Sequence, residues 1–234
     1  MNSAIAQLKA AAPTISVGIL TADLLNLGSE ISLLEEAGVR LVHFDVMDGC
    51  FCPMMTIGPP FIKAVKTPLL KDVHLLIQDP LDKVETYVAA GADIVTVHVE
   101  SADDMLPTLR KLKGVIRGIA LNPGTPMEAI EPLLDEVEMV VVLAVVPVPQ
   151  ERASRSVGRV SSKFEDSTPE RLAQARKMIG SRDILLCVDG GIKRDNIAEV
   201  AKLGADIIVT GSAVFDGKSP RENAEFMVSV MRNA

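Results

Sequence analysis

The chain has 234 residues, of which 48% are hydrophobic and 24% charged, and its formal net charge is −7. This composition is that of a globular protein whose core is large enough to fold without disulfides or a structural metal. The acidic balance and the aromatic content of 3% argue against nucleic-acid binding, which needs basic surfaces or stacking platforms.

No apolar run approaches the ~18 residues of a membrane span, so we expect no membrane partner. The N-terminus lacks the charged and then apolar pattern of a secretory signal. Three cysteines are too few for a disulfide framework and suit a reducing compartment. These features predict a cytoplasmic protein.

One short unit recurs along the chain: a helical stretch ends in Ala-Gly or Leu-Gly, and an apolar, β-branched run follows it. Gly38, Gly91 and Gly204 end three of these stretches, where glycine enters the left-handed region at little cost. Runs that are apolar throughout are typical of parallel strands buried on both faces. In chain order, the expected strands are 15–20, 41–44, 73–76, 94–97, 116–121, 139–145, 184–188 and 207–209.

Helical patterns alternate with these runs. They cover residues 26–37, 59–66, 80–90, 102–112, 126–134, 168–179, 193–203 and 220–232. Eight strands alternating with eight helices predict an α/β fold, a single (β/α)8 TIM barrel. A doubly wound open sheet is the alternative, because periodicity does not reveal whether a sheet closes. No low-complexity linker divides the chain, so we expect one domain over residues 1–234.

The active sites of such barrels lie at the carboxyl ends of the strands. All three histidines of the chain, His43, His74 and His98, fall at or near the ends of expected strands. His43 and Asp45 share one face of a strand because they are two residues apart. Together with His74 and with Asp189 they could bind a divalent transition metal and leave a position open for substrate. The structural alternative is a hydrogen-bonded core histidine and an aspartate that caps a helix.

Two glycine-containing loops indicate a phosphate site. Gly190 and Gly191 follow the seventh strand, and Gly211 and Ser212 follow the eighth. Exposed backbone N–H groups in these two loops are a recurrent phosphate-binding site of (β/α)8 barrels. The alternative is that the glycines only form tight turns.

Several segments, in order along nearly the whole chain, resemble the ribulose-phosphate 3-epimerase family. The most specific is the run from His43 to Gly49, followed by Pro53 and by residues 56–60. The other matching segments are residues 19–23, 72–75, 97–100, 121–126, 188–191 and 211–213.

The resemblance implies a barrel that epimerises C3 of a phosphorylated ketose, usually interconverting ribulose 5-phosphate and xylulose 5-phosphate. It implies a divalent Zn, Fe or Mn ion bound by His43, Asp45, His74 and Asp189. It also implies that Asp45 and Asp189 are the acid and the base, which transfer protons through a metal-stabilised enediolate. Met47 would join the glycine loops in binding the sugar phosphate. Family members are often dimers or hexamers, so we expect a homo-oligomer.

The chain departs from the family pattern at several positions. Gly18 stands where the first strand usually has a serine, and Leu76 and Leu143 stand where methionines are expected near the enediolate. The Gly-rich phosphate loop after the sixth strand is replaced by a longer segment, 147–164, whose one glycine is Gly158.

The 147–164 segment has two interpretations. Its Arg152, Arg155 and Arg159 could bind an anion through their planar guanidinium groups, which would indicate a different sugar phosphate or an acid sugar as substrate. It could instead be a solvated surface loop.

The same residues bear on two further functions. A non-catalytic sugar-phosphate-binding barrel is possible, but the presence of both Asp45 and Asp189 argues against it. A phosphate-barrel decarboxylase would carry a lysine two residues after the strand-two aspartate, and Met47 occupies that position.

Overall fold

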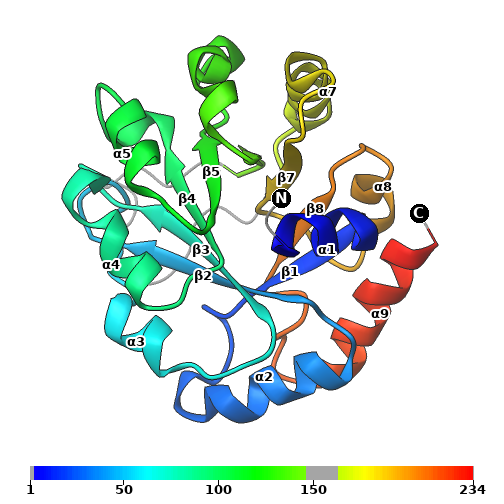
Figure 1. Cartoon of the computed structure of the whole chain (residues 1–234). Helices are drawn as coiled ribbons and strands as arrows, with labels where there is room; N and C mark the ends of the chain where they lie inside the picture. The colour runs from blue at the N-terminus through cyan, green and yellow to red at the C-terminus, as the bar shows by residue number, and fades with distance from the viewer. Residues whose placement is uncertain (1–2, 146–162, 234) are drawn as a thin grey trace.

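The computed structural model describes residues 3–145 and 163–233, and its strands form a closed barrel in the order β1 to β8, drawn in Figure 1. Neighbouring strands pair in parallel, and β1 pairs with β8 to close the ring. The strands are β1 (Thr14–Gly18), β2 (Leu41–Met47), β3 (Leu70–Leu76), β4 (Ile94–His98), β5 (Ile116–Leu121), β6 (Met139–Leu143), β7 (Leu185–Asp189) and β8 (Ile207–Thr210). The predicted (β/α)8 barrel is confirmed, and the open sheet is wrong.

Helices surround this barrel (Figure 1). The α-helices are α1 (Ser3–Ala11), α2 (Leu27–Glu36), α3 (Pro59–Ala64), α4 (Val84–Ala89), α5 (Leu106–Lys111), α7 (Thr168–Ile179), α8 (Ile197–Ala201) and α9 (Pro220–Arg232). Short 3-10 helices are η1 (Leu24–Asn26), η2 (Pro80–Asp82), η3 (Val99–Ser101) and η4 (Met127–Glu136). Within residues 3–145 and 163–233, no helix has the length and apolar character needed to cross a membrane.

The bounds of several elements differ from the prediction. Strand β2 continues to Met47, so Asp45 lies within the strand and not after it. The expected helix at 126–134 is the 3-10 helix η4, which contains Pro132; a proline cannot donate to an α-helical ladder. The helix expected at 80–90 is divided into η2 and α4.

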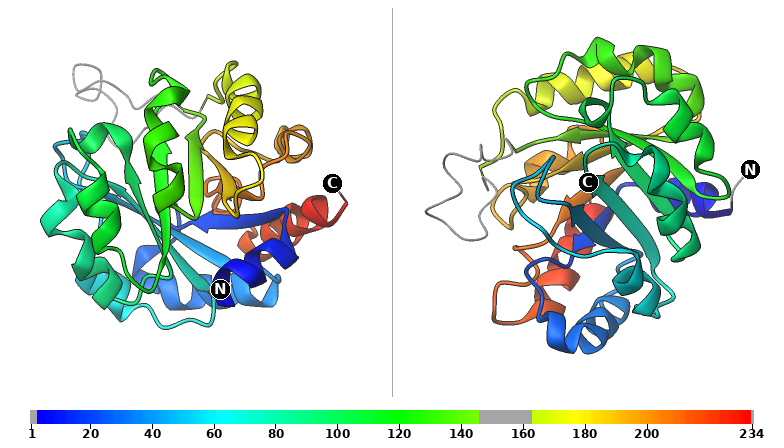
Figure 2. Two further views of the ribbon diagram at one scale, coloured as in Figure 1. Left: turned by 45° about the horizontal axis from the view of Figure 1, so that its top comes forward. Right: turned by 90° about the vertical axis from the view of Figure 1, so that its left-hand side faces the viewer.

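Helix α1 was not predicted, and it closes the amino-terminal end of the barrel. Its Ala4, Ile5 and Leu8 belong to one buried apolar cluster with residues that begin strands, such as Leu41 and Ile94. Figure 2 shows α1 at one end of the barrel. The opposite end, where the strands finish, is the one left for the site.

The alternation of side chains along β2 separates the helix layer from the barrel interior. Val42, Phe44 and Val46 pack into the apolar layer between the strands and the surrounding helices. Successive side chains of a strand point to opposite faces, so His43 and Asp45 point into the barrel. The same rule places polar groups of the other strands there.

Candidate metal centre

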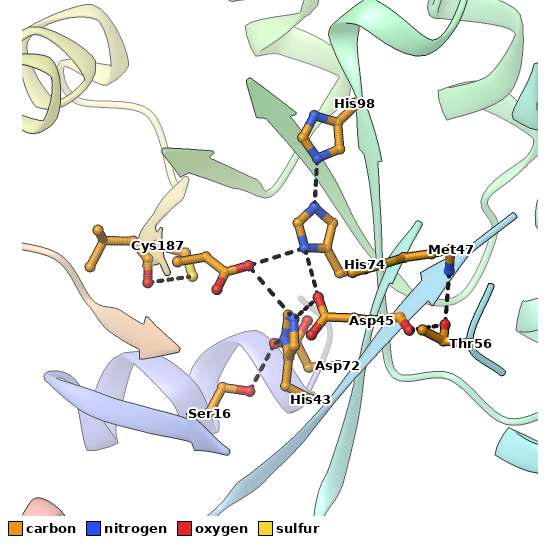
Figure 3. Close-up of polar contacts among 11 residues, drawn as sticks. Ser16, His43, Asp45, Met47, Thr56, Asp72, His74, His98 and Cys187 are labelled. Carbon is orange, nitrogen blue, oxygen red and sulfur yellow. Dashed lines mark hydrogen bonds and ion pairs between the residues drawn. The ribbon is translucent and has the colours of Figure 1, made fainter. Parts of the chain in front are cut away.

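Strand register brings the four predicted ligands together in the barrel interior. Asp45 on β2 is paired with His74 on β3, two residues beyond the pair His43 and Asp72 and on the same face of the sheet. Asp189 ends β7 on the far side of the barrel. Figure 3 shows the side chains of His43, Asp45 and His74 directed toward one another.

The four potential ligand atoms form a closed quadrilateral in which histidine and aspartate alternate. His43 Nε2 lies 3.2 Å from Asp45 Oδ1 and 3.7 Å from Asp189 Oδ2. His74 Nδ1 lies 3.6 Å from Asp45 Oδ1 and 3.1 Å from Asp189 Oδ2. The two carboxylates therefore occupy opposite corners, as do the two imidazoles.

This donor set fits a small divalent transition metal. Bonds of ~2.0–2.2 Å to nitrogen and oxygen place neighbouring ligand atoms roughly 2.9–3.4 Å apart, close to the observed sides of 3.1–3.7 Å. All four atoms lie within 4.8 Å of one another. Two imidazoles with two carboxylates suit Zn, Fe or Mn.

The second ring nitrogen of His43 is held by a carboxylate that sequence reasoning assigned no role. Asp72 Oδ2 lies 2.7 Å from His43 Nδ1 and accepts a 2.8 Å hydrogen bond from the Ser16 hydroxyl. Asp72 and His43 are both only 2% exposed. A signal was available, because Asp72 and His74 are two residues apart, like His43 and Asp45, and this spacing puts both side chains on one face of a strand.

The second ring nitrogen of His74 is held by another histidine. His74 Nε2 lies 2.9 Å from His98 Nε2, and His98 Nδ1 lies 3.0 Å from Glu100 Oε2. Glu100 Oε1 accepts hydrogen bonds from the Asn122 amide and the Thr125 hydroxyl. His98 is therefore not one of the four side chains that could hold a metal ion, but it contacts one of them, His74.

Opposite charges in the quadrilateral shift the pKa of its members. Burial opposes protonation of His43, but the carboxylates of Asp72 and Asp45 hold the pKa of this imidazole well above its usual value. Burial likewise opposes protonation of His74, yet the hydrogen bonds to Asp189 and Asp45 raise its pKa to about 9. The pKa of Asp45 is lowered, because His43 and His74 outweigh the effect of burial.

An apolar cap covers the carboxyl side of the centre. Met47, Cys52 and Leu76 are buried in one cluster, with Phe51 packed against it. Burial and the neighbouring carboxylates raise the pKa of the Cys52 thiol to about 11. Asp48 anchors this loop by accepting backbone N–H groups. Cys52 is therefore a packing residue of the cap, and Met47 lies where it can contact a substrate.

The predicted phosphate-binding residues lie on the same end of the barrel. A Cβ added at Gly211 would come within 2.9 Å of the Gly18 carbonyl oxygen, so β8 and β1 approach closely there. Gly191 has φ +69° and lies against the backbone of Phe164. In the described part of the chain, the N–H groups of Gly191 and Ser212 have no hydrogen-bond acceptor. The glycine loops therefore offer free donors, although α8 and α9 begin several residues later.

Some departures from the family pattern lie beside the centre, and others fall outside the described residues. Gly18 is paired with His43, Leu143 is paired with Asp189, and Leu76 joins the cap. The arginines of the 147–164 segment, Arg152, Arg155 and Arg159, lie outside the described residues.

We predict that cation binding tightens as the pH rises from 7 to 9. His74 has a pKa of about 9 without a cation, so at pH 7 a cation must displace its proton, and at pH 9 much of that competition is gone. Each displaced proton changes the apparent affinity by about tenfold per pH unit. Co²⁺ titrations between pH 6 and 9.5, with proton release followed by an indicator dye, measure this dependence. Equal affinity at pH 7 and 9 would contradict it.

Comparison with known proteins agrees with the geometry. The profile of the ribulose-phosphate 3-epimerase family matches residues 14–215. The ribulose-phosphate 3-epimerase of Bacillus subtilis is 37% identical over 90% of this chain and 95% of its own length. The enzyme of the same name from Rhodobacter capsulatus is 41% identical, over 88% of this chain and 87% of its own.

Solved structures support the fold alone. The 3-hexulose-6-phosphate synthase of Salmonella typhimurium superposes with a TM-score of 0.68 at 23% identity, covering 94% of this chain and 99% of its own. A Mycobacterium tuberculosis tryptophan synthase chain gives a TM-score of 0.70 at 15% identity, covering 98% of this chain and 97% of its own. The family profile and the two curated relatives establish that this chain belongs to the ribulose-phosphate 3-epimerase family.

Proposed function

We propose that this protein is a metal-dependent epimerase that inverts C3 of a phosphorylated ketose, interconverting ribulose 5-phosphate and xylulose 5-phosphate. The observation that carries the proposal is the placement of Asp45 and Asp189 at opposite corners of the quadrilateral, each within 3.7 Å of both imidazoles. An inversion next to a carbonyl by two proton transfers on opposite faces needs two opposed acid–base groups, and these two carboxyl groups can supply them.

Inverting this carbon means removing a proton from one face and returning one to the other. Asp45 comes from β2 and Asp189 from β7, so a sugar carbon between them would meet one carboxyl group on each face. One group must begin as the carboxylate and the other as the acid, and the two exchange roles when the reaction runs backward. A bound Zn, Fe or Mn ion would supply positive charge that stabilises the enediolate between the two transfers.

The cap favours this chemistry by limiting water at the reacting carbon. Met47, Cys52 and Leu76 form the apolar cap beside the carboxylates. A dry site strengthens the electrostatic interactions within it and slows proton leakage to solvent. We infer that the enzyme acts in the cytoplasm, where its three free thiols would stay reduced.

We predict that Asp45→Asn and Asp189→Asn each lower the rate of interconversion of the two pentulose phosphates by at least about 100-fold, the order of magnitude of the contribution of one acid–base group. Because each variant keeps the acid–base group of one face only, it should still exchange the C3 proton of one epimer with D₂O, and the two variants should favour opposite epimers. The assay is deuterium incorporation by NMR with Zn²⁺, Mn²⁺ or Fe²⁺ supplied in turn at saturation.

Asp183→Asn serves as the control, because this carboxylate is 57% exposed and pairs with Lys9 of α1 at the other end of the barrel. It should leave exchange unchanged. If neither site variant slows interconversion, the proposed roles are wrong. Running the wild type with other ketose phosphates and acid sugars tests whether the substrate differs from the pentulose phosphates.

We infer that Gly190, Gly191, Gly211 and Ser212 bind the phosphate group of the substrate through backbone N–H groups. We predict that Gly211→Ala raises KM for the sugar phosphate by about tenfold, since its Cβ would meet the Gly18 carbonyl oxygen at 2.9 Å and displace the loop. Gly28→Ala is the control, because no atom lies within 4 Å of a Cβ added there. Steady-state kinetics, with metal content measured in parallel, gives the KM of both variants. An unchanged KM in Gly211→Ala contradicts the assignment of this loop to phosphate binding.

We infer a homo-oligomer from apolar side chains exposed on three neighbouring loops. Leu25, Met55 and Leu81 are 96%, 79% and 37% exposed and follow β1, β2 and β3. Exposed apolar patches at one end of a barrel are typical of association surfaces. Leu25→Asp should lower the mass measured by light scattering, whereas Gln7→Asp on α1, at the opposite end, should not. A monomeric wild type would refute the inference.

A further inference from the structure

A cation can bind Nδ1 of His74 only when this nitrogen carries no proton. The contacts of the other ring nitrogen, Nε2, can select the tautomer in which the proton is on Nε2. Nδ1 of His74 faces the carboxylates, while Nε2 lies 2.9 Å from His98 Nε2. A contact between two ring nitrogens requires one donor and one acceptor. When Nδ1 of His74 is a bare ligand, its Nε2–H must donate, so Nε2 of His98 must accept.

The acceptor role of His98 fixes the rest of the chain of contacts. A neutral imidazole with a bare Nε2 carries its proton on Nδ1. Nδ1 of His98 lies 3.0 Å from Glu100 Oε2, and a carboxylate accepts this proton without offering one in return. The ring protons therefore all point away from the metal centre and toward Glu100.

Glu100 is held as an acceptor on both of its oxygens. Its second oxygen, Oε1, accepts a 2.7 Å hydrogen bond from the backbone N–H of Asn122 and another from the Thr125 hydroxyl. Arg171 on α7 fixes the loop that carries these donors, through hydrogen bonds of 2.9 and 2.8 Å to the carbonyls of Asn122 and Thr125. The backbone N–H cannot reverse its role, so Oε1 must remain an acceptor.

Water cannot easily replace these contacts. His98 is fully buried and His74 is 1% exposed, and the ring of Phe51 in the cap lies 5.0 Å from that of His98. Figure 3 shows His98 directly behind His74 as seen from the carboxylates. The two rings lie within 9° of parallel, with centroids 4.9 Å apart. A change at Glu100 would therefore be transmitted along fixed rings.

We propose that Glu100 and His98 are positioning residues that select the tautomer of His74 that binds the cation, with the remaining ring proton on Nε2 and not on Nδ1. The proposal rests on the metal centre described above. In His43, the carboxylate of Asp72 contacts the second ring nitrogen directly and can hold the proton there. In His74, the carboxylate of Glu100 acts through the intervening imidazole of His98. Partners of this kind typically change metal affinity by about 10–100-fold.

Glu100→Gln tests this mechanism because an amide offers one acceptor and one donor. If the amide oxygen stays on the Asn122 N–H, the amide NH₂ faces Nδ1 of His98 and favours the proton on its Nε2. That proton then opposes the Nε2–H of His74 and drives the His74 proton onto Nδ1, the ligand nitrogen. If the amide turns the other way, its NH₂ opposes the Asn122 N–H.

The control is Glu138→Gln, at the amino-terminal end of the barrel. Glu138 is matched in exposure, 25% against 22% for Glu100, and it also accepts several hydrogen bonds, all from Arg117. A second test variant, His98→Phe, keeps a ring of similar shape but cannot accept from His74.

Three measurements are made on the full chain. Zn²⁺ affinity by chelator competition should fall about 10–100-fold in Glu100→Gln and in His98→Phe and stay unchanged in Glu138→Gln. The Co²⁺ absorption spectrum should change in the first two variants alone. Long-range ¹H–¹⁵N spectra of the Zn²⁺-loaded wild type, which has only three histidines to assign, should show the His98 proton on Nδ1.

The proposal is overturned if Glu100→Gln binds Zn²⁺ as tightly as the wild type, or if the wild-type spectra place the His98 proton on Nε2. A change in thermal stability shared equally by Glu100→Gln and Glu138→Gln, with unchanged affinity, would likewise reduce the chain of contacts to a structural role. Failure of the metal centre itself looks different, because the wild type would then bind no Zn²⁺ and His43→Ala would change nothing.

Discussion

Charge balance inside the mouth of the barrel is the constraint on which the rest of the structure depends. Asp45, Asp72 and Asp189 point into an interior with little access to water, and a buried carboxylate is stable only beside positive charge or hydrogen-bond donors. His43 and His74 supply that charge as imidazolium ions when no cation is bound, which is why the pKa of each is raised. Protons and a cation therefore compete for one preformed cage, and loading it requires no rearrangement of the strands.

The apolar half of the barrel makes this balance possible. Below the polar layer, side chains of the strand starts pack against Ile5 and Leu8 of α1, so solvent does not reach Asp72 from the amino-terminal end. Among the described residues, its hydrogen-bond partners are Ser16 and His43, both at Oδ2. Helix α1 contributes no atom to the chemistry, yet it helps to keep the polar layer dry and its hydrogen bonds specific.

The sequence was sufficient for the architecture, because the alternation of strands and helices follows from periodicity. The grouping of His43, Asp45, His74 and Asp189 was predicted from their places at strand ends and from the family resemblance, and the structure brings these four side chains together. Residues two apart share a face of a strand, which places His43 beside Asp45. The same rule was available for Asp72 and His74, but hydropathy alone does not show that a charged side chain deep in a strand is a partner of a ligand and not a ligand itself. For that reason β2 was also expected to end at Phe44, before Asp45.

Other features depend on tertiary contacts that a single sequence does not encode locally. His43 turns Nε2 and His74 turns Nδ1 toward the centre, and each choice is dictated by the side chain on the other nitrogen. Helix α1 is short and alanine-rich, and its apolar residues acquire a role only because the barrel has an open end to fill. The 3-10 form of η4 follows from Pro132, which the sequence displays, although the helix continues two residues beyond the expected end.

The departures from the family pattern show how recognition and chemistry are separated in this barrel. Met47 and Leu76 stand two positions beyond Asp45 and His74 on the same strand faces, so they line the space above the ligands. Replacing a methionine there changes the polarisability and shape that a substrate meets, but it leaves every charge of the cage in place. Gly18 likewise changes the space beside the cage and none of its charges, since it has no side chain next to His43. Strand pairing fixes the positions of the four proposed ligands, whereas the next layer of side chains departs from the family pattern, so this layer is where a change of substrate would leave the proposed proton transfers in place.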